Sequence, residues 1–147
     1  MRMDAGKFST GIEMVENYRL KVSFNSDKIE DIFVDEPEPL GEGTYPNAGR
    51  LLAAAVGSCL CASLAFCLRK SRASVTSMTA EVSTKLERNE SGRLRVASMT
   101  VSIRPRVDDP EKLERCRDIF EDFCIVTQSV REGISVKVDI TSPVSPS

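Results

Sequence analysis

The side chains of this 147-residue chain that could do covalent chemistry are its five cysteines, because the chain contains no histidine. Without histidine, one chain can form neither a Ser-His-Asp triad nor a Cys-His pair. Zinc sites that use histidine are excluded as well, and no paired CxxC motifs are present, so we expect no metal. A reactive cysteine in this protein must obtain its activation from other groups.

Three cysteines, Cys59, Cys61 and Cys67, lie in the uncharged stretch "LLAAAVGSCLCASLAFCL" at 51–68. A bilayer span needs about 20 apolar residues, but this stretch is rich in Ala, Ser, Cys and Gly rather than Leu and Ile. Good helix formers dominate it, and we predict a buried helix over 50–70 and no membrane partner. A helix that is apolar on every side is buried on every side, which a chain of this size achieves with a second copy. We therefore predict a tight homodimer centred on this helix.

The bulk composition narrows the partners and the compartment. A net charge of -2 and a pI of about 5.3 give no reason to expect nucleic acid or an anionic membrane. The polar start "MRMDAGKFST" has no secretory signal, and the number of cysteines is odd. We therefore expect reduced thiols and a cytoplasmic location.

Hydrophobic patterning predicts an α+β fold with antiparallel sheets, because strands and helices do not alternate as βαβ units. The loop at 35–49 is rich in proline, glycine and carboxylates. In the strand expected at 93–107 the apolar residues change from even to odd positions, which predicts a β-bulge near residues 97–98. We expect one domain over 1–140 and a disordered tail over 141–147. The predicted elements are a meander of strands at 7–15, 18–24 and 28–34, the helix at 50–70, a hairpin of strands at 77–86 and 93–107 turning at 89–92, a helix from Asp109, and a last strand at 133–140.

The second helix is predicted to begin at Asp109, a good N-cap, with Pro110 in its first position. Its apolar residues fall within an arc of about 100°, so that Cys116 and Cys124 both face the core. They are Leu113, Cys116, Phe120, Phe123 and Cys124. Packing of this helix on the first makes a meeting of Cys59 with Cys124 geometrically reasonable. Cys61 lies about 200° round the helix from Cys59, and we interpret Cys61 and Cys67 as packing residues.

The chain resembles the OsmC/Ohr family of organic hydroperoxide resistance proteins. The resemblance rests on "DEP" at 35–37, "GEGTYPNAGRLLAAAVGSCLCASL" at 41–64 and "FCIVTQSVREGISVKVDI" at 123–140. It implies an intertwined homodimer with long central helices and active sites at the interface. It also implies a thiol peroxidase without metal or cofactor, in which Cys59 is the peroxidatic cysteine and Cys124 the resolving one. An external dithiol would reset the enzyme.

The match is weaker around the residues that would stabilise a thiolate. Family peroxidases use an arginine that is held by a glutamate in the loop before the helix, and the matching glutamate position here is Gly49. Candidate supporting residues are Arg50, Arg19 and Glu42, although alternation in the second strand places Arg19 away from the apolar face. The second motif reads "CIVT" where family members carry Cys-Pro-Val-Ser.

Three functions stay open, and with them the question of whether the protein is an enzyme. The first is a cysteine-based peroxidase that reduces organic hydroperoxides through a Cys59 sulfenic acid and a Cys59–Cys124 disulfide. The second is a non-peroxidase dimer that binds a small apolar or sulfur-containing ligand at its interface. The third is a structural role.

Overall fold

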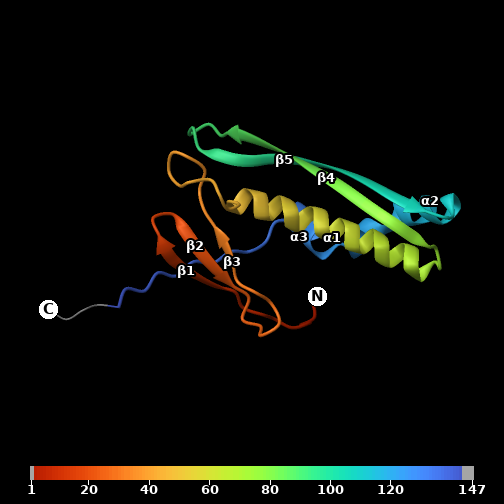
Figure 1. Ribbon diagram of the computed structural model, residues 1–147, viewed down its shortest axis with the longest axis horizontal. Coiled ribbons are helices and arrows are strands. Elements are labelled where there is room, and N and C mark those ends of the chain that lie inside the picture. The colour runs from red at the N-terminus through yellow and green to blue at the C-terminus, as the bar shows by residue number, and fades with distance from the viewer. Residues whose placement is uncertain (1, 144–147) are drawn as a thin grey trace. The chain divides into compact units, whose positions relative to one another are not determined.

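The computed structural model describes residues 2–143, and Figure 1 shows its elements in chain order. The elements are β1 (Gly11–Glu16), β2 (Arg19–Ser23), β3 (Ile32–Val34), α1 (Ala48–Lys70), β4 (Val75–Arg88), β5 (Leu94–Val107), α2 (Pro110–Ile119), a 3-10 helix η1 (Phe120–Phe123) and α3 (Ile125–Glu132). This mixed α+β composition with antiparallel sheets confirms the predicted fold class.

The chain divides into two compact units. One holds the residues up to Ala55 together with Val82–Val101, and the other holds Val56–Glu81 with the residues from Ser102 onward. The predicted single domain over 1–140 stays a prediction. The first unit contains the three-stranded meander, and the second contains most of α1 and the segments α2, η1 and α3.

The meander β1–β2–β3 is antiparallel, as predicted from the alternating pattern. Val22 is buried and pairs with Ile12 on one side and with Ile32 on the other, so one apolar row runs across the three strands. Asn17 takes a positive φ of 51° in the turn between β1 and β2. The third strand is shorter than predicted because the backbone turns at Ser26, whose carbonyl accepts from the Ile29 N–H.

Helix α1 begins two residues before the predicted start and ends as predicted. One side of it is buried, with Val56, Leu60, Leu64 and Leu68 in the core, whereas Phe66 is 57% exposed. The chain alone therefore leaves part of this apolar helix uncovered. Among residues 2–143, α1 is the one helix long and apolar enough to cross a membrane, a test that core helices of soluble proteins also pass.

The hairpin β4–β5 turns at Asn89–Gly92, where the Gly92 N–H donates to the Asn89 carbonyl. In β5 the odd-numbered residues from Met99 onward are less exposed than their neighbours, which agrees with the predicted parity of that half of the strand. The predicted β-bulge near residues 97–98 stays a prediction.

The segment after β5 is more broken than predicted. The Asp109 side chain caps α2 by accepting from the N–H groups of Glu111 and Lys112, as expected. The helix ends at Ile119, tightens into η1, and leaves Cys124 in an extended conformation before α3 begins. Cys116 and Cys124 are buried as predicted, but the prediction that Phe123 faces the core is wrong, because the change of helical pitch turns this side chain outward.

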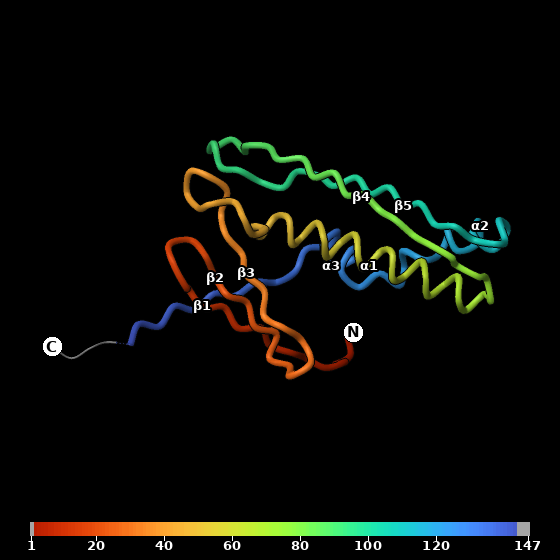
Figure 2. The backbone as a smooth tube through the Cα atoms, in the orientation of Figure 1, coloured from red at the N-terminus to blue at the C-terminus, as the bar shows by residue number. Residues whose placement is uncertain are grey.

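Residues 133–143 form no strand, and Figure 2 traces them as an extended path after α3. The predicted strand at 133–140 is therefore wrong for the chain alone, since a strand needs a hydrogen-bonded neighbour and none pairs with it among the described residues. Its alternate apolar residues are exposed: Ile134, Val136, Val138 and Ile140. Of the predicted disordered tail at 141–147, the last four residues lie outside the described residues.

Candidate thiol active site

Cys59 and Cys124 meet within the second unit, where the two thiols are hydrogen-bonded to each other. Cys59 lies in the middle of α1 and is half-buried, whereas Cys124 is 0% exposed at the junction between η1 and α3. Two free sulfurs in contact, one of them reachable from solvent, form a pair that can be oxidised to a disulfide.

The first turn of α3 points its free N–H groups at these two sulfurs. Cys124 is the N-cap of α3, the Val126 N–H donates to Cys59 Sγ at 3.5 Å, and the Thr127 N–H donates to Cys124 Sγ. These N–H groups have no partner inside the helix, and the helix N-terminus carries partial positive charge. The two sulfurs therefore occupy a position that favours negative charge.

Two hydroxyl groups complete the surroundings of Cys124. Burial raises the pKa of the Cys124 thiol, but hydrogen bonds with the Thr127 hydroxyl, Cys59, the Thr127 N–H and the Ser63 hydroxyl outweigh it, so that this pKa lies below its ordinary value. The Cys124 Sγ–H donates to Thr127 Oγ1 at 3.0 Å, and both Thr127 and Ser63 are buried. No role was predicted for these hydroxyls from the sequence. Their spacing nevertheless indicates that they lie near the two sulfurs, since Ser63 follows Cys59 by one helical turn and Thr127 is the N3 residue of α3.

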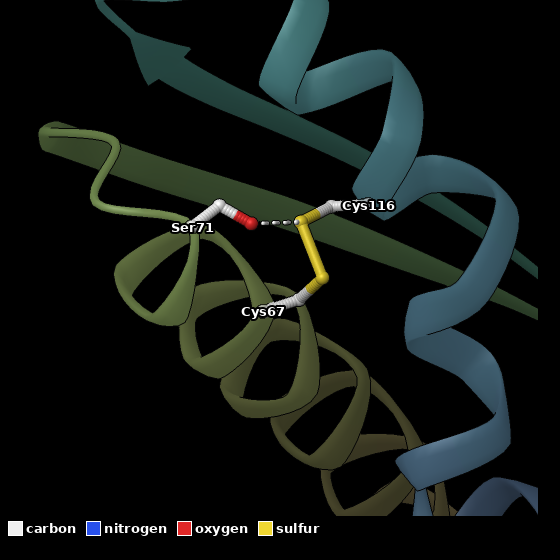
Figure 3. Close-up of a disulfide and its surroundings, with 3 residues drawn as sticks. All are labelled: Cys67, Ser71 and Cys116. Atoms are coloured by element: carbon white, nitrogen blue, oxygen red, sulfur yellow. Dashed lines mark hydrogen bonds between the residues drawn. A yellow bond between two sulfur atoms is a disulfide. The ribbon is translucent and has the colours of Figure 1, made fainter.

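The remaining cysteines separate into two kinds. Burial raises the pKa of the Cys61 thiol above its ordinary value, which agrees with its interpretation as a packing residue. Cys67 and Cys116 form a disulfide that joins α1 to α2, and Figure 3 shows the Ser71 hydroxyl directed at the Cys116 sulfur. The predictions that all thiols are reduced and that Cys67 only packs are therefore wrong, because α2 brings Cys116 directly against Cys67.

The first unit contains two of the candidate supporting residues, Arg19 and Glu42, and they form a salt bridge. Arg19 donates to Glu42 at 2.8 Å, and its guanidinium carbon lies 5.0 Å from the centre of the Tyr45 ring. The Arg19 side chain is only 24% exposed, because the loop that carries Glu42 and Tyr45 covers this side of β2. Arg19 thus lies on the face opposite the apolar row, but this face is covered rather than open to solvent, and the glutamate that holds Arg19 is Glu42 rather than a residue at position 49.

Asp35 holds this loop in shape. Its buried carboxylate accepts from the N–H groups of Glu36 at 2.8 Å and Glu42 at 3.1 Å, and its own N–H donates to the Pro46 carbonyl. Gly41 packs so closely that a Cβ there would collide with the Asp35 carboxylate and the Glu36 carbonyl. The loop conformation that presents Glu42 to Arg19 is thus fixed by a buried acid and a glycine.

Arg50 is exposed in the first turn of α1, where its N–H donates to Asn47 Oδ1 at 2.9 Å. A role for Arg50 within one chain would require residues 46–50 to remain a loop, and α1 instead begins at Ala48. In the part of the chain that the structure describes, no group of three or more potential ligands could hold a metal ion.

The sequence profile of OsmC-like proteins matches residues 41–139, which is more than half of the chain. The chain belongs to the OsmC-like family. Its family segment thus includes Glu42, helix α1 and both cysteines of the candidate site. A search of curated protein sequences found no significant match.

Solved structures agree with this family assignment. An OsmC-like protein of unknown function from Vibrio cholerae is similar at a TM-score of 0.73 and 16% identity, covering 84% of this chain and 93% of that chain. An organic hydroperoxide resistance protein from Legionella pneumophila is similar at a TM-score of 0.63 and 14% identity, covering 88% and 92%. Another Vibrio cholerae structure, with captopril bound in one of its active sites, is similar at 0.63 and 15%, covering 88% and 87%. At these identities the likeness establishes the fold.

Proposed function

We propose that this OsmC-like protein is a thiol peroxidase that reduces organic hydroperoxides. The observation that carries the proposal is the contact of Cys59 with Cys124 at the N-terminus of α3. A peroxidase of this type needs one accessible thiol to meet the peroxide and a second thiol within reach to resolve the product. Cys59 is half-buried and Cys124 is completely buried, so the two roles fall to them in that order.

In the first step the Cys59 thiolate attacks the outer oxygen of the hydroperoxide. The O–O bond breaks, the alkoxide leaves and takes up a proton to become the alcohol, and Cys59 becomes a sulfenic acid. Cys59 loses two electrons and the peroxide gains them. The Val126 N–H donates to Cys59 Sγ, where it stabilises the negative charge on sulfur before the attack.

In the second step Cys124 attacks the sulfur of the Cys59 sulfenic acid. A disulfide forms, and hydroxide leaves and is protonated to water. The hydrogen bonds that keep the Cys124 pKa below its ordinary value provide the thiolate for this attack. An external dithiol then reduces the Cys59–Cys124 disulfide and restores both thiols.

We assign the arginine of the reaction to Arg19, held by Glu42. The support for this assignment is an arginine that is paired with a glutamate in the loop before α1, although the position that matches the family's own glutamate is Gly49. Within this assignment Glu42 positions Arg19, and Asp35 and Gly41 fix the loop that carries Glu42.

We further propose that the protein acts as a homodimer. The exposed apolar side of α1 and the exposed alternate residues of the segment after α3 are surfaces that a second copy would cover. Val136 and Val138 are 78% and 79% exposed, which is unfavourable for apolar side chains that no other chain covers. Replacement of both valines by aspartate is expected to shift a dimer to monomers in light scattering coupled to size-exclusion chromatography.

The activity is tested with stoichiometric tert-butyl hydroperoxide added to protein in which Cys59 and Cys124 are reduced. The proposal expects loss of one peroxide per chain and a Cys59–Cys124 link in disulfide mapping by mass spectrometry. A Cys59→Ser variant is expected to consume no peroxide, and Cys61→Ser serves as the matched control because it removes a free cysteine of the same helix.

A second candidate function is the binding of a small sulfur-containing ligand without turnover. The observation in its favour is the structure of this fold from Vibrio cholerae that holds captopril in one of its active sites. Unchanged peroxide concentration, together with saturable binding of captopril that Cys59→Ser weakens, would support this second function over the first.

A further inference from the structure

The two cysteine pairs of the second unit form a repeated arrangement. Cys59 and Cys67 are eight residues apart on α1, and Cys116 and Cys124 are eight residues apart on the segment that faces it. The contacting pairs are Cys59 with Cys124 and Cys67 with Cys116. In both, the serine four residues after the α1 cysteine contacts the sulfur of the partner cysteine: Ser63 contacts Cys124, and Ser71 contacts Cys116. Both pairs therefore lie along one packing seam, about 12 Å apart along α1.

The two pairs differ in state. Cys67 and Cys116 are joined as a disulfide, whereas Cys59 and Cys124 are free thiols in contact. Figure 3 shows the disulfide holding α2 against the end of α1. The contact between α1 and the facing segment thus contains one disulfide and one pair of free thiols.

The disulfide is the main attachment of α2. Within α2 the one buried residue is Cys116, which is 1% exposed, and the rest of the helix is polar or only partly covered. A helix with so little buried apolar area gains little free energy from packing. The polar contacts of the helix itself are long, since Lys112 Nζ reaches the Arg72 carbonyl at 3.4 Å and the Ser71 contact is 3.7 Å long. Shorter hydrogen bonds lie before the helix, where Asp108 and Ser74 exchange bonds of 2.9 and 3.2 Å.

The segment from Cys116 to Cys124 connects the disulfide to the candidate active site and is held by its own hydrogen bonds. The Phe120 N–H donates to the Cys116 carbonyl, the Cys124 N–H donates to the Glu121 carbonyl at 3.1 Å, and Phe120 is buried. Glu121 is also tied to α3, because its carboxylate pairs with Arg131 at 2.6 Å. This short hydrogen-bonded connection limits how far Cys124 can move relative to Cys116.

We propose that the Cys67–Cys116 disulfide is a positioning clamp, which holds the resolving thiol Cys124 against Cys59. The clamp takes no part in the chemistry of the peroxide, and this role rests on the proposed function. Opening the clamp releases α2 and η1, so that Cys124 spends less time within reach of Cys59. A displacement of about 1 Å from reacting geometry can cost on the order of 100-fold in rate, so a tenfold slower closure is a conservative expectation.

The test measures closure of the Cys59–Cys124 disulfide in a Cys67→Ala/Cys116→Ala variant, with Cys61→Ala as the matched control. Closure is driven in one arm by tert-butyl hydroperoxide and in the other by diamide, which oxidises two neighbouring thiols to a disulfide and becomes a hydrazine. Quenched samples are mapped by mass spectrometry, and Cys59 sulfenic acid is trapped with dimedone.

The clamp predicts that the variant still forms Cys59 sulfenic acid because Cys59 itself is unchanged, and that this step slows less than closure does, although the Val126 N–H contact with Cys59 Sγ also loosens. Closure to the disulfide is expected to slow at least tenfold in both arms, and excess hydroperoxide is expected to convert Cys59 to sulfinic acid. If the disulfide only stabilises the fold, its removal lowers the melting temperature of the variant and leaves the rate of Cys59–Cys124 closure below that temperature unchanged.

The two proposals can fail separately. Unconsumed hydroperoxide in the wild type, with neither Cys59 sulfenic acid nor a Cys59–Cys124 disulfide, overturns the peroxidase, while the diamide arm still measures the clamp. Closure rates within twofold of wild type in the diamide arm overturn the clamp. If the alanine variant does not fold, Cys67→Val/Cys116→Ala restores apolar volume at the buried site, and the same two outcomes decide.

Discussion

The replacement of Thr127 by valine is the sharpest test of the environment assigned to Cys124. The Thr127 hydroxyl lies 3.0 Å from Cys124 Sγ, and it is first among the hydrogen bonds that lower the pKa of this buried thiol. A hydrogen bond to a charged group contributes about 1.5–3 kcal/mol. Thr127→Val should therefore raise the Cys124 pKa, because the thiolate loses a hydrogen bond of this magnitude.

The measurement uses a Cys59→Ser/Cys61→Ser background, in which Cys124 is the remaining free thiol while Cys67 and Cys116 stay linked. The ultraviolet absorbance of the thiolate, taken as the difference from the same variant carrying Cys124→Ser, then reports the titration of Cys124. Thr127→Ser keeps the hydroxyl and is the matched control. An unchanged midpoint in Thr127→Val, or an equal rise in Thr127→Ser, would refute the assigned role of the hydroxyl.

The same pKa shift has a consequence for stability. Because folding lowers the Cys124 pKa, the folded chain binds fewer protons than the unfolded chain between the folded pKa and the ordinary value of about 8.5. The free energy of unfolding of the background variant should therefore rise with pH through this window, and the gain is lost as pH falls through the folded pKa. Thr127→Val should flatten this rise in urea unfolding.

Three further predictions concern the surroundings of the site. Cys67→Ala/Cys116→Ala opens a loop with a sequence separation of 49 residues and should lower the free energy of unfolding by about 4 kcal/mol in urea, whereas a loss below about 1 kcal/mol would contradict a stabilising disulfide. Arg19→Ala should slow formation of the Cys59 sulfenic acid by about 100-fold in stopped-flow peroxide assays, and an unchanged rate would remove Arg19 from the mechanism. Gly41→Ala should destabilise the chain by about 1–3 kcal/mol, since its Cβ meets Asp35, and equal thermal stability with wild type would show that the loop adapts.

Much of the fold could be predicted because local patterns and local structure agree. The alternation around Val22 predicted the meander, and Asp109 with Pro110 marked the start of α2. The strand predicted at 133–140 does not form, because its alternate apolar residues are exposed and no neighbouring strand pairs with it among the described residues. An alternating pattern predicts that one face is covered, but it does not identify the segment that covers it.

The Cys59–Cys124 contact was reasonable from the expected packing of the second helix on the first, and the family resemblance implied the same pair. The Arg19–Glu42 pair was not predicted, because strand alternation assigns a side chain to a face without revealing the loop that later covers that face. The Cys67–Cys116 disulfide was not predicted, although the equal spacing of eight residues on α1 and on the facing segment is compatible with both pairs.

Disulfide mapping after a single turnover is the decisive experiment for the proposal that Cys59 and Cys124 act together on hydroperoxides. Protein with an intact Cys67–Cys116 disulfide and reduced Cys59 and Cys124 is mixed with one equivalent of tert-butyl hydroperoxide and analysed by mass spectrometry. The account predicts a Cys59–Cys124 disulfide, the release of one alcohol per chain, and neither product in Cys59→Ser. Unconsumed hydroperoxide with both thiols still free would contradict it.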